Sequence, residues 1–117
     1  MKVDRVKGHL DLLLLGILST DPGHGYAVIT QLRERTDGLI DLTEGAVYPA
    51  LHRLEDLGLL SSDWHPVGGR RRRLYRITAK GSAALARERA EWDRLSSAIA
   101  IVLRTASMPA SAAEARA

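Results

Sequence analysis

Apolar residues recur at intervals of three and four in the first half of the chain, which is the spacing of a buried helix face. In residues 9–20 these positions are so dense that we expect a helix covered on most sides. The Asp-Pro-Gly turn at 21–23 ends this helix, because Pro and Gly together are a strong stop signal. A second helix is predicted over residues 25–35. Its expected core stripe consists of Tyr26, Ile29 and Leu32.

Capping signals at both ends predict a third helix over residues 44–57. Thr43 is a typical N-cap residue, and Glu44 places a carboxylate in the first turn, where it favours the helix dipole. Gly58 follows at the position where helices often end in a left-handed residue. The expected buried stripe consists of Val47, Leu51, Leu54 and, at the very end, Leu57.

Two extended runs follow, at residues 59–65 and 74–78, and the Gly68–Gly69 pair between them predicts a β-hairpin. A long last helix is expected over residues 79–107, and the alanine-rich residues 108–117 read as a disordered tail. With 117 residues the chain suits one small fold, mostly α with a β-hairpin.

The composition narrows the possible chemistry. Since there is no cysteine, disulfides, thiolate nucleophiles and cysteine-ligated zinc are excluded. The four histidines lack the spacing of a metal site, and the Gly-Gly pair is too short for a phosphate-binding loop. We therefore expect no catalytic site, no metal and no cofactor. Neither a secretory signal nor a membrane span is recognisable, which favours a cytoplasmic protein without a membrane partner.

Positive charge is concentrated in one place. The net charge is only +3, yet five arginines fall within residues 70–76. Along an extended strand Arg70 and Arg72 would point to one face, and Arg71 and Arg73 to the other, so the four cannot meet one partner equally. Considered alone, such a run is also compatible with a solvated hairpin that binds nothing.

The third helix next to the hairpin changes this interpretation. A helix with one apolar face and with Tyr48, His52 and Arg53 on its polar face fits the major groove of DNA, which admits one helix. A hairpin tipped with glycine and arginine beside it would reach the flanking backbone or minor groove. Together these elements predict a winged helix-turn-helix that binds double-stranded DNA.

Five strings in the chain resemble the PadR family of bacterial transcriptional regulators. They are HGY at 24–26, YPALHRLE at 48–55, GLL at 58–60, GRRR at 69–72 and YRITAKG at 75–81. The resemblance implies a winged helix-turn-helix domain over residues 1–78. It also implies that residues 79–107 are the single C-terminal helix of short-tailed members, which dimerise through their first and last helices.

The same resemblance assigns the DNA contacts. On the recognition helix they would be Thr43, Glu44, Gly45, Ala46, Tyr48, Pro49, His52 and Arg53. On the wing they would be Gly69, Arg70, Arg71 and Arg72. The chain departs from the family at the helix start, where a hydroxyl is missing at Ala46 and Glu44 would repel phosphates unless it accepts a bond from a cytosine amino group. This departure concerns the target sequence and not the binding mode.

The last helix carries an apolar stripe that an isolated helix cannot bury. We expect it to be a dimer contact, with Trp92 as an aromatic anchor. Some family members bind flat aromatic molecules at the dimer interface, so the resemblance also implies a possible effector site here. The residues of this dimer or ligand surface are Leu13, Trp92, Asp93, Leu95, Ile99 and Val102.

The resulting expectation is a homodimeric repressor with a pseudo-palindromic operator, released by a small aromatic ligand. Two alternatives stay open. One is a module whose main task is to sense such a ligand. The other is a winged helix used mainly for protein–protein interaction, which the fold alone does not exclude.

Overall fold

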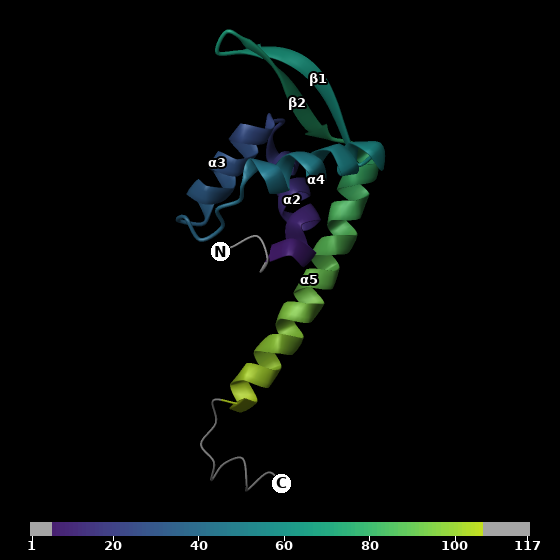
Figure 1. Ribbon diagram of the computed structural model, residues 1–117. Coiled ribbons are helices and arrows are strands. Elements are labelled where there is room, and N and C mark those ends of the chain that lie inside the picture. The colour runs from purple at the N-terminus through teal and green to yellow at the C-terminus, as the bar shows by residue number, and fades with distance from the viewer. Residues whose placement is uncertain (1–5, 107–117) are drawn as a thin grey trace, which may run out of the picture. The chain divides into compact units, whose positions relative to one another are not determined.

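The computed structural model describes residues 6–106 and confirms a mostly helical fold with one β-hairpin (Figure 1). In chain order the elements are the 3-10 helix η1 (Lys7–His9), α2 (Leu10–Thr20), α3 (Gly25–Arg35), α4 (Glu44–Asp56), β1 (Leu60–Val67), β2 (Arg70–Ile77) and α5 (Ala79–Ala106). The chain divides into two compact units between Ala86 and Arg87, inside α5. The tail expected at 108–117 lies outside the described residues.

The first unit buries one apolar face from each of α2, α3 and α4. Three positions of the stripe expected on α4 are confirmed, because Val47, Leu51 and Leu54 are completely buried. The fourth is wrong: Leu57 is 50 % exposed. Its side chain lies past the end of α4 at Asp56, where the helical periodicity no longer governs its direction.

The core stripe of α3 is shifted from the expected one. Tyr26 is 53 % exposed, whereas Val28 is buried together with Ile29 and Leu32. The helix begins at Gly25, which is buried as well, so the inward face runs through positions 25, 28, 29 and 32. The prediction that Tyr26 belongs to the core stripe is wrong, although its place three residues before Ile29 also fits a helix face.

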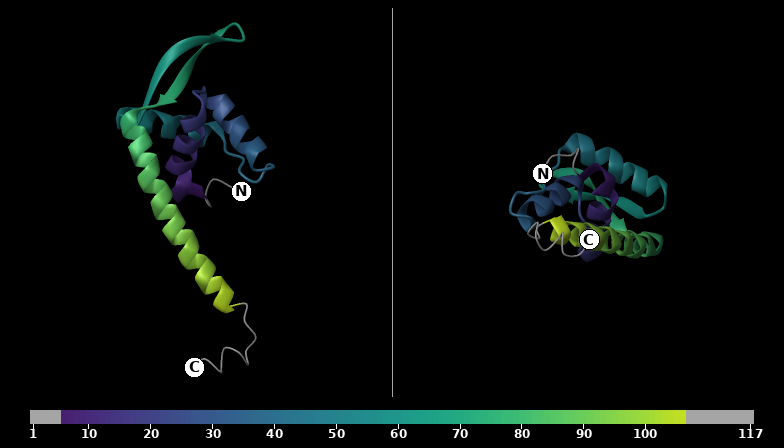
Figure 2. Two further views of the ribbon diagram at one scale, coloured as in Figure 1. Left: turned by 180° about the vertical axis from the view of Figure 1, so that it is seen from behind. Right: turned by 90° about the horizontal axis from the view of Figure 1, so that it is seen from below.

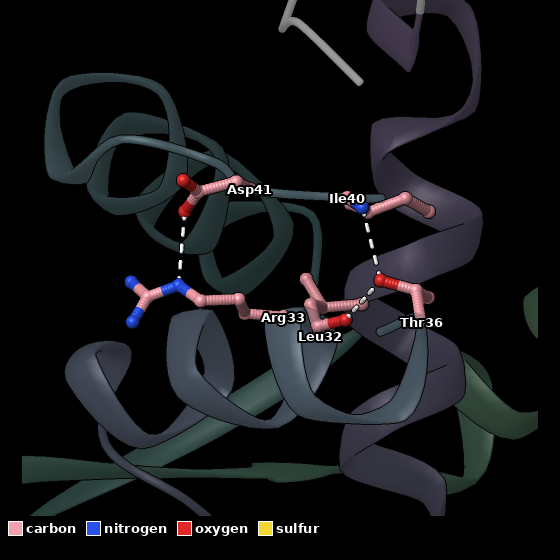
Figure 3. Close-up of polar contacts among 5 residues, drawn as sticks. All are labelled: Leu32, Arg33, Thr36, Ile40 and Asp41. Carbon is pink, nitrogen blue, oxygen red and sulfur yellow. Dashed lines mark hydrogen bonds and ion pairs between the residues drawn. The ribbon is translucent and has the colours of Figure 1, made fainter. Parts of the chain in front are cut away.

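Side-chain bonds fix the end of α3 and the segment that leads to α4 (Figure 3). The Thr36 hydroxyl donates to the Leu32 carbonyl oxygen at 2.7 Å and accepts from the backbone amide of Ile40 at 2.9 Å. Arg33 donates to Asp41 at 3.1 Å. These contacts lead the chain to Thr43, whose hydroxyl accepts from the amide of Ala46 at 3.3 Å and caps α4 as expected.

The hairpin is longer than the sequence indicates. The strands extend over residues 60–67 and 70–77 and leave only Gly68 and Gly69 as the turn, with φ of 58° and 79°. Two left-handed residues make the tight turn whose twist matches that of the flanking strands, which glycine adopts without strain. The four arginines therefore lie within β2, which begins at Arg70 and not at Leu74, and β1 extends to Val67 and not only to His65. Figures 1 and 2 show the turn projecting beyond α2, α3 and α4.

A third chain segment joins the hairpin at its base. The amide of Gly23 donates to the carbonyl oxygen of Tyr75 at 3.0 Å, and the amide of Tyr75 donates back to Gly23 at 2.9 Å. The turn after α2 thus pairs with the outer edge of β2. This bridge was not foreseen, because Gly23 indicates only a turn when the sequence is considered locally.

The start of α5 is bonded to the end of α4. Thr78 accepts from the amide of Gly81 at 3.0 Å, as an N-cap residue does, and its hydroxyl donates to the Gly58 carbonyl at 2.7 Å. Lys80 donates to the Leu57 carbonyl at 2.8 Å. The carbonyl groups of the two residues that follow α4 are thereby satisfied by Thr78 and the beginning of α5. Gly58, with a φ of 78°, ends α4 in the expected left-handed conformation.

The second unit is helical from Arg87 to the end of α5. Large apolar side chains are exposed along it: Trp92 at 40 %, Leu95 and Ile99 at 46 % each and Val102 at 65 %. Across the part of the chain that the structure describes, no helix combines the length and the apolar character needed to cross a membrane.

Candidate nucleic-acid interface

The polar face of α4 is open along most of its length. Thr43, Glu44 and Gly45 are exposed at its start, and Pro49, His52 and Arg53 are exposed further along. The apolar face opposite them is the buried stripe, so the same helix packs against the core and presents polar residues to solvent. We call these exposed residues the polar ridge of α4: Thr43, Glu44, Gly45, Pro49, His52 and Arg53. Ala46 and Tyr48 are half-buried between the two faces.

Tyr48 is held by an unusually close neighbour on α3. A Cβ atom at Gly25 would lie 2.6 Å from Cε1 of the Tyr48 ring, closer than such atoms approach. Glycine at position 25 therefore lets the ring pack directly against the start of α3. The ring position of Tyr48 is thus determined by the helix–helix contact, which sets the direction of its hydroxyl as well.

Arg53 has an intramolecular partner that was not foreseen. Its guanidinium binds both carboxylate oxygens of Asp11 on α2, one of them at 3.1 Å. The hydrogen bond to Asp11 raises the pKa of Arg53, which stays fully charged. Arg53 is 51 % exposed and Asp11 is 37 % exposed, so this ion pair adds little to the stability of the fold. Its two parallel bonds nevertheless fix the direction of the Arg53 guanidinium.

The wing arginines divide between two faces, as strand alternation predicts. Cross-strand pairing places Arg73 opposite Trp64, and Arg71 opposite Pro66. Both guanidinium groups lie over the Trp64 ring, with their central carbons 5.1 Å (Arg73) and 5.6 Å (Arg71) from the ring centroid. Such cation–π contacts hold the two side chains close to the indole.

Arg73 also connects the wing to the recognition helix. Its Nε donates to the Ser62 hydroxyl at 2.7 Å, and that hydroxyl donates to the Glu55 carboxylate on α4. Glu55 itself lies 3.9 Å from Arg73. The resemblance did not assign Arg73 to DNA contact, and its bonds show a role in holding β2 against α4. In the sequence, this role is indicated only by the alternation of side chains along a strand. That alternation places four residues on one face of the hairpin: Ser62, Trp64, Arg71 and Arg73.

A cleft of about 240 Å³ lies between α4, the start of α3 and the base of the wing. It contains two of the residues expected to bind DNA on α4, Tyr48 and His52, and one of the wing, Arg72. Its full lining is His24, Gly25, Tyr48, His52, Trp64, Arg72, Arg73 and Tyr75. The lining has cationic, imidazole and aromatic groups and includes no carboxylate.

His24 has a defined protonation in this cleft. Its Nδ1 accepts from the amide of Ala27 at 3.2 Å and caps α3, so the proton of the neutral ring is on Nε2. Burial, and secondly the positive charge of Arg72, lower the pKa of His24. A neutral imidazole that donates through Nε2 is therefore the form favoured at neutral pH.

The residues expected at the dimer or ligand surface fall in different units. Leu13 is half-buried on α2, packed against the core of the first unit. Trp92, Asp93, Leu95, Ile99 and Val102 all belong to α5 in the second unit and are exposed. These five residues therefore share one helix. The spacing of the four apolar residues, Trp92, Leu95, Ile99 and Val102, places their side chains along one side of it.

Comparison with known proteins gives one family and a consistent fold. Residues 14–87 match the model of the transcriptional regulator PadR-like family. Transcriptional regulator Rv3488 of Mycobacterium tuberculosis is 48 % identical over 54 residues, which are 46 % of this chain and 50 % of that protein.

Solved structures extend the similarity over most of the chain. A transcriptional regulator from Clostridium thermocellum is 30 % identical, with a TM-score of 0.76 and coverage of 82 % of this chain and 94 % of that one. A PadR family regulator from Eggerthella lenta is 32 % identical, also with a TM-score of 0.76, covering 86 % and 87 % of the two chains.

Proposed function

Because the chain belongs to the PadR-like family of transcriptional regulators, we propose that it is a homodimeric repressor that reads a pseudo-palindromic operator. The first unit is the winged helix-turn-helix, with α4 in the major groove and the hairpin on the flanking backbone. The polar ridge of α4 supplies base contacts, through His52 and the residues near its start. The wing supplies phosphate contacts, which bind without regard to sequence.

One observation carries this proposal. The exposed face of α4 and the arginines of β2 border the same cleft, so both kinds of DNA contact lie next to each other in one unit. The Glu55–Ser62–Arg73 bonds hold these two elements against each other, and Gly25 lets Tyr48 of α4 pack closely on α3. A protein-binding wing would need neither the row of arginines nor its attachment to a polar helix face.

The dimer is proposed from the exposed stripe of α5. Trp92, Leu95, Ile99 and Val102 would be shielded from water if two copies of this helix packed together. The proposal extends to an effector: a flat aromatic ligand would stack on Trp92, near Asp93, and release the DNA.

In a Trp64→Phe variant, Trp92 is the only remaining tryptophan, so an aromatic effector should quench the tryptophan fluorescence of this variant. Lack of quenching by any compound that releases DNA would exclude Trp92 from the effector site.

Selection of bound duplexes from a random pool tests the function. We expect enrichment of inverted repeats whose half-sites lie one helical turn apart, about 34–36 Å. Transcription from a promoter that carries the selected site should fall when the protein is added. Enrichment of single half-sites would contradict the two-fold dimer. No enrichment even at low salt would contradict DNA reading and favour the protein-interaction alternative.

Ile99→Glu tests the dimer, because a buried carboxylate without a partner is costly at a helix–helix contact. The variant should dimerise at least about 30-fold more weakly, as measured by analytical ultracentrifugation over a concentration series. Ser97→Glu is the matched control, since residue 97 is two positions from both Leu95 and Ile99 and faces away from the stripe. Equal dimerisation of the two variants would show that the interface lies elsewhere.

A further inference from the structure

The cleft at the base of the wing has the features of an anion site. Three hydrogen-bond donors on different elements line it: His24 before α3, Tyr48 on α4 and Arg72 on β2. No carboxylate is among its lining residues. Glu55, which is not among the lining residues, accepts from Ser62 and lies 3.9 Å from Arg73.

The walls of the cleft strengthen this preference. Tyr75 is almost completely buried, and the Trp64 ring is covered by guanidinium groups. These aromatic walls bring no negative charge that would repel an anion, and the guanidinium groups over Trp64 add positive charge beside them. Donors held by other bonds also lose little conformational freedom on binding; the cap of His24 on Ala27 and the packing of Tyr48 on Gly25 are such constraints.

The position of the cleft selects the kind of anion. With α4 in a major groove and the wing beyond it, one strand of the DNA backbone separates the two contacts. That strand must pass across the space between α4 and β2, where the cleft opens. The groups that face it are phosphodiesters, each of which carries one negative charge and accepts hydrogen bonds.

We propose that this cleft receives one backbone phosphodiester of each half-site, with Arg72 and His24 Nε2 as its donors. The inference rests on the proposed function and adds to it a specific site, in which His24 is a DNA-binding residue that the resemblance did not assign. Tyr48 serves there as a wall and a further donor. The phosphate then fixes the register of α4 in the groove without itself reading sequence.

A scan with methylphosphonate linkages tests the proposal. In a duplex recovered by the selection above, each phosphodiester is replaced in turn by the neutral methylphosphonate, and affinity is measured by fluorescence anisotropy. For the wild-type protein, one linkage per half-site should weaken binding about tenfold more than its neighbours, the scale of a lost charged hydrogen bond. In Arg72→Ala and in His24→Asn, this extra loss should disappear at the same linkage.

The variants are chosen so that folding is retained. Asparagine at position 24 keeps an N-cap acceptor for α3 but is too short to reach into the cleft. Arg70→Ala is the matched control, because Arg70 projects from the same face of β2 as Arg72, is two residues nearer the turn and does not line the cleft. This control should keep the tenfold loss at that linkage while weakening binding as a whole.

Three results would overturn the site. The first is a linkage effect of the same size in Arg72→Ala, His24→Asn and wild type, and the second is its equal loss in Arg70→Ala. The third is a shift of the His24 ring signals in NMR spectra with millimolar inorganic phosphate but not with the duplex, which would assign the cleft to a free anion. Failure of the protein to bind any duplex would instead overturn the proposed function, and that outcome is visible before the scan begins.

Discussion

Arg71→Ala combined with Arg72→Ala should weaken binding to every duplex by about 100-fold near physiological salt. The two side chains leave opposite faces of β2, so the double change removes one positive charge from each face of the wing. Each lost phosphate contact should also lower the slope of log affinity against log salt concentration by about 0.9, giving a total change of about 1.8. Anisotropy titrations at several salt concentrations measure both quantities.

The control for this variant carries the same change in charge at another place. Arg87→Ala with Arg89→Ala removes two exposed arginines from α5, which carries none of the proposed DNA contacts. Its salt slope should remain close to that of the wild type. An unchanged slope in the wing variant would show that these arginines do not meet phosphates.

A lysine version separates charge from geometry. Arg71→Lys with Arg72→Lys keeps both charges, so the salt slope should be retained. Affinity should still fall, because an ammonium group cannot bind a phosphate with two parallel bonds and stacks less well on Trp64. If the lysine variant lost the slope as well, the cause would be a distorted wing and not missing contacts.

Gly81→Ala should destabilise the protein by about 3 kcal/mol, the upper part of the range for an overpacked site. A Cβ atom at position 81 would collide with the backbone carbonyl of Leu59 and lie 2.8 Å from Cγ1 of Ile77. The carbonyl belongs to the segment between α4 and β1 and cannot turn away as a flexible side chain would. Urea denaturation at a fixed protein concentration measures the loss, since a dimer's apparent stability depends on concentration.

Gly45→Ala is the matched control for this clash. The added Cβ would have its nearest neighbour, the Thr43 hydroxyl oxygen, at 3.9 Å, which is ordinary contact. Alanine is a better helix former than glycine, so the stability should change little or rise by about 0.5 kcal/mol. If Gly81→Ala proved as stable as this control, α5 would not approach Leu59 as closely as described.

Features that depend on neighbouring residues could be predicted from the sequence. The three helices of the first unit begin and end within about a residue of the expected positions, because their signals are local: Thr43 caps α4 through Ala46, and Gly58 ends it in the left-handed region. Helical spacing likewise indicated the buried stripe of α4. The resemblance extended these local signals to a family and to a set of DNA contacts that remain predictions.

The length of the hairpin could not be predicted from the sequence, because it depends on pairing between residues that are far apart in the chain. Residues 70–73 are uniformly charged, and nothing in their order shows that each pairs with a residue of β1. Cross-strand hydrogen bonds make a strand of almost any composition once the turn sets the register. The Gly23–Tyr75 bridge has the same origin, since its two partners are far apart in the chain.

By itself, the sequence determined the order of the helices, the Gly-Gly turn and the concentration of arginine that follows it, because each depends on spacing or identity along the chain. Only the tertiary structure decided what those arginines and their neighbours do. It placed Arg73 in bonds to Ser62, paired Arg53 with Asp11, and brought His24 and Arg72 to one cleft. The physical reason is that a charged side chain binds the nearest suitable partner in space, and that partner lies on another element of the fold.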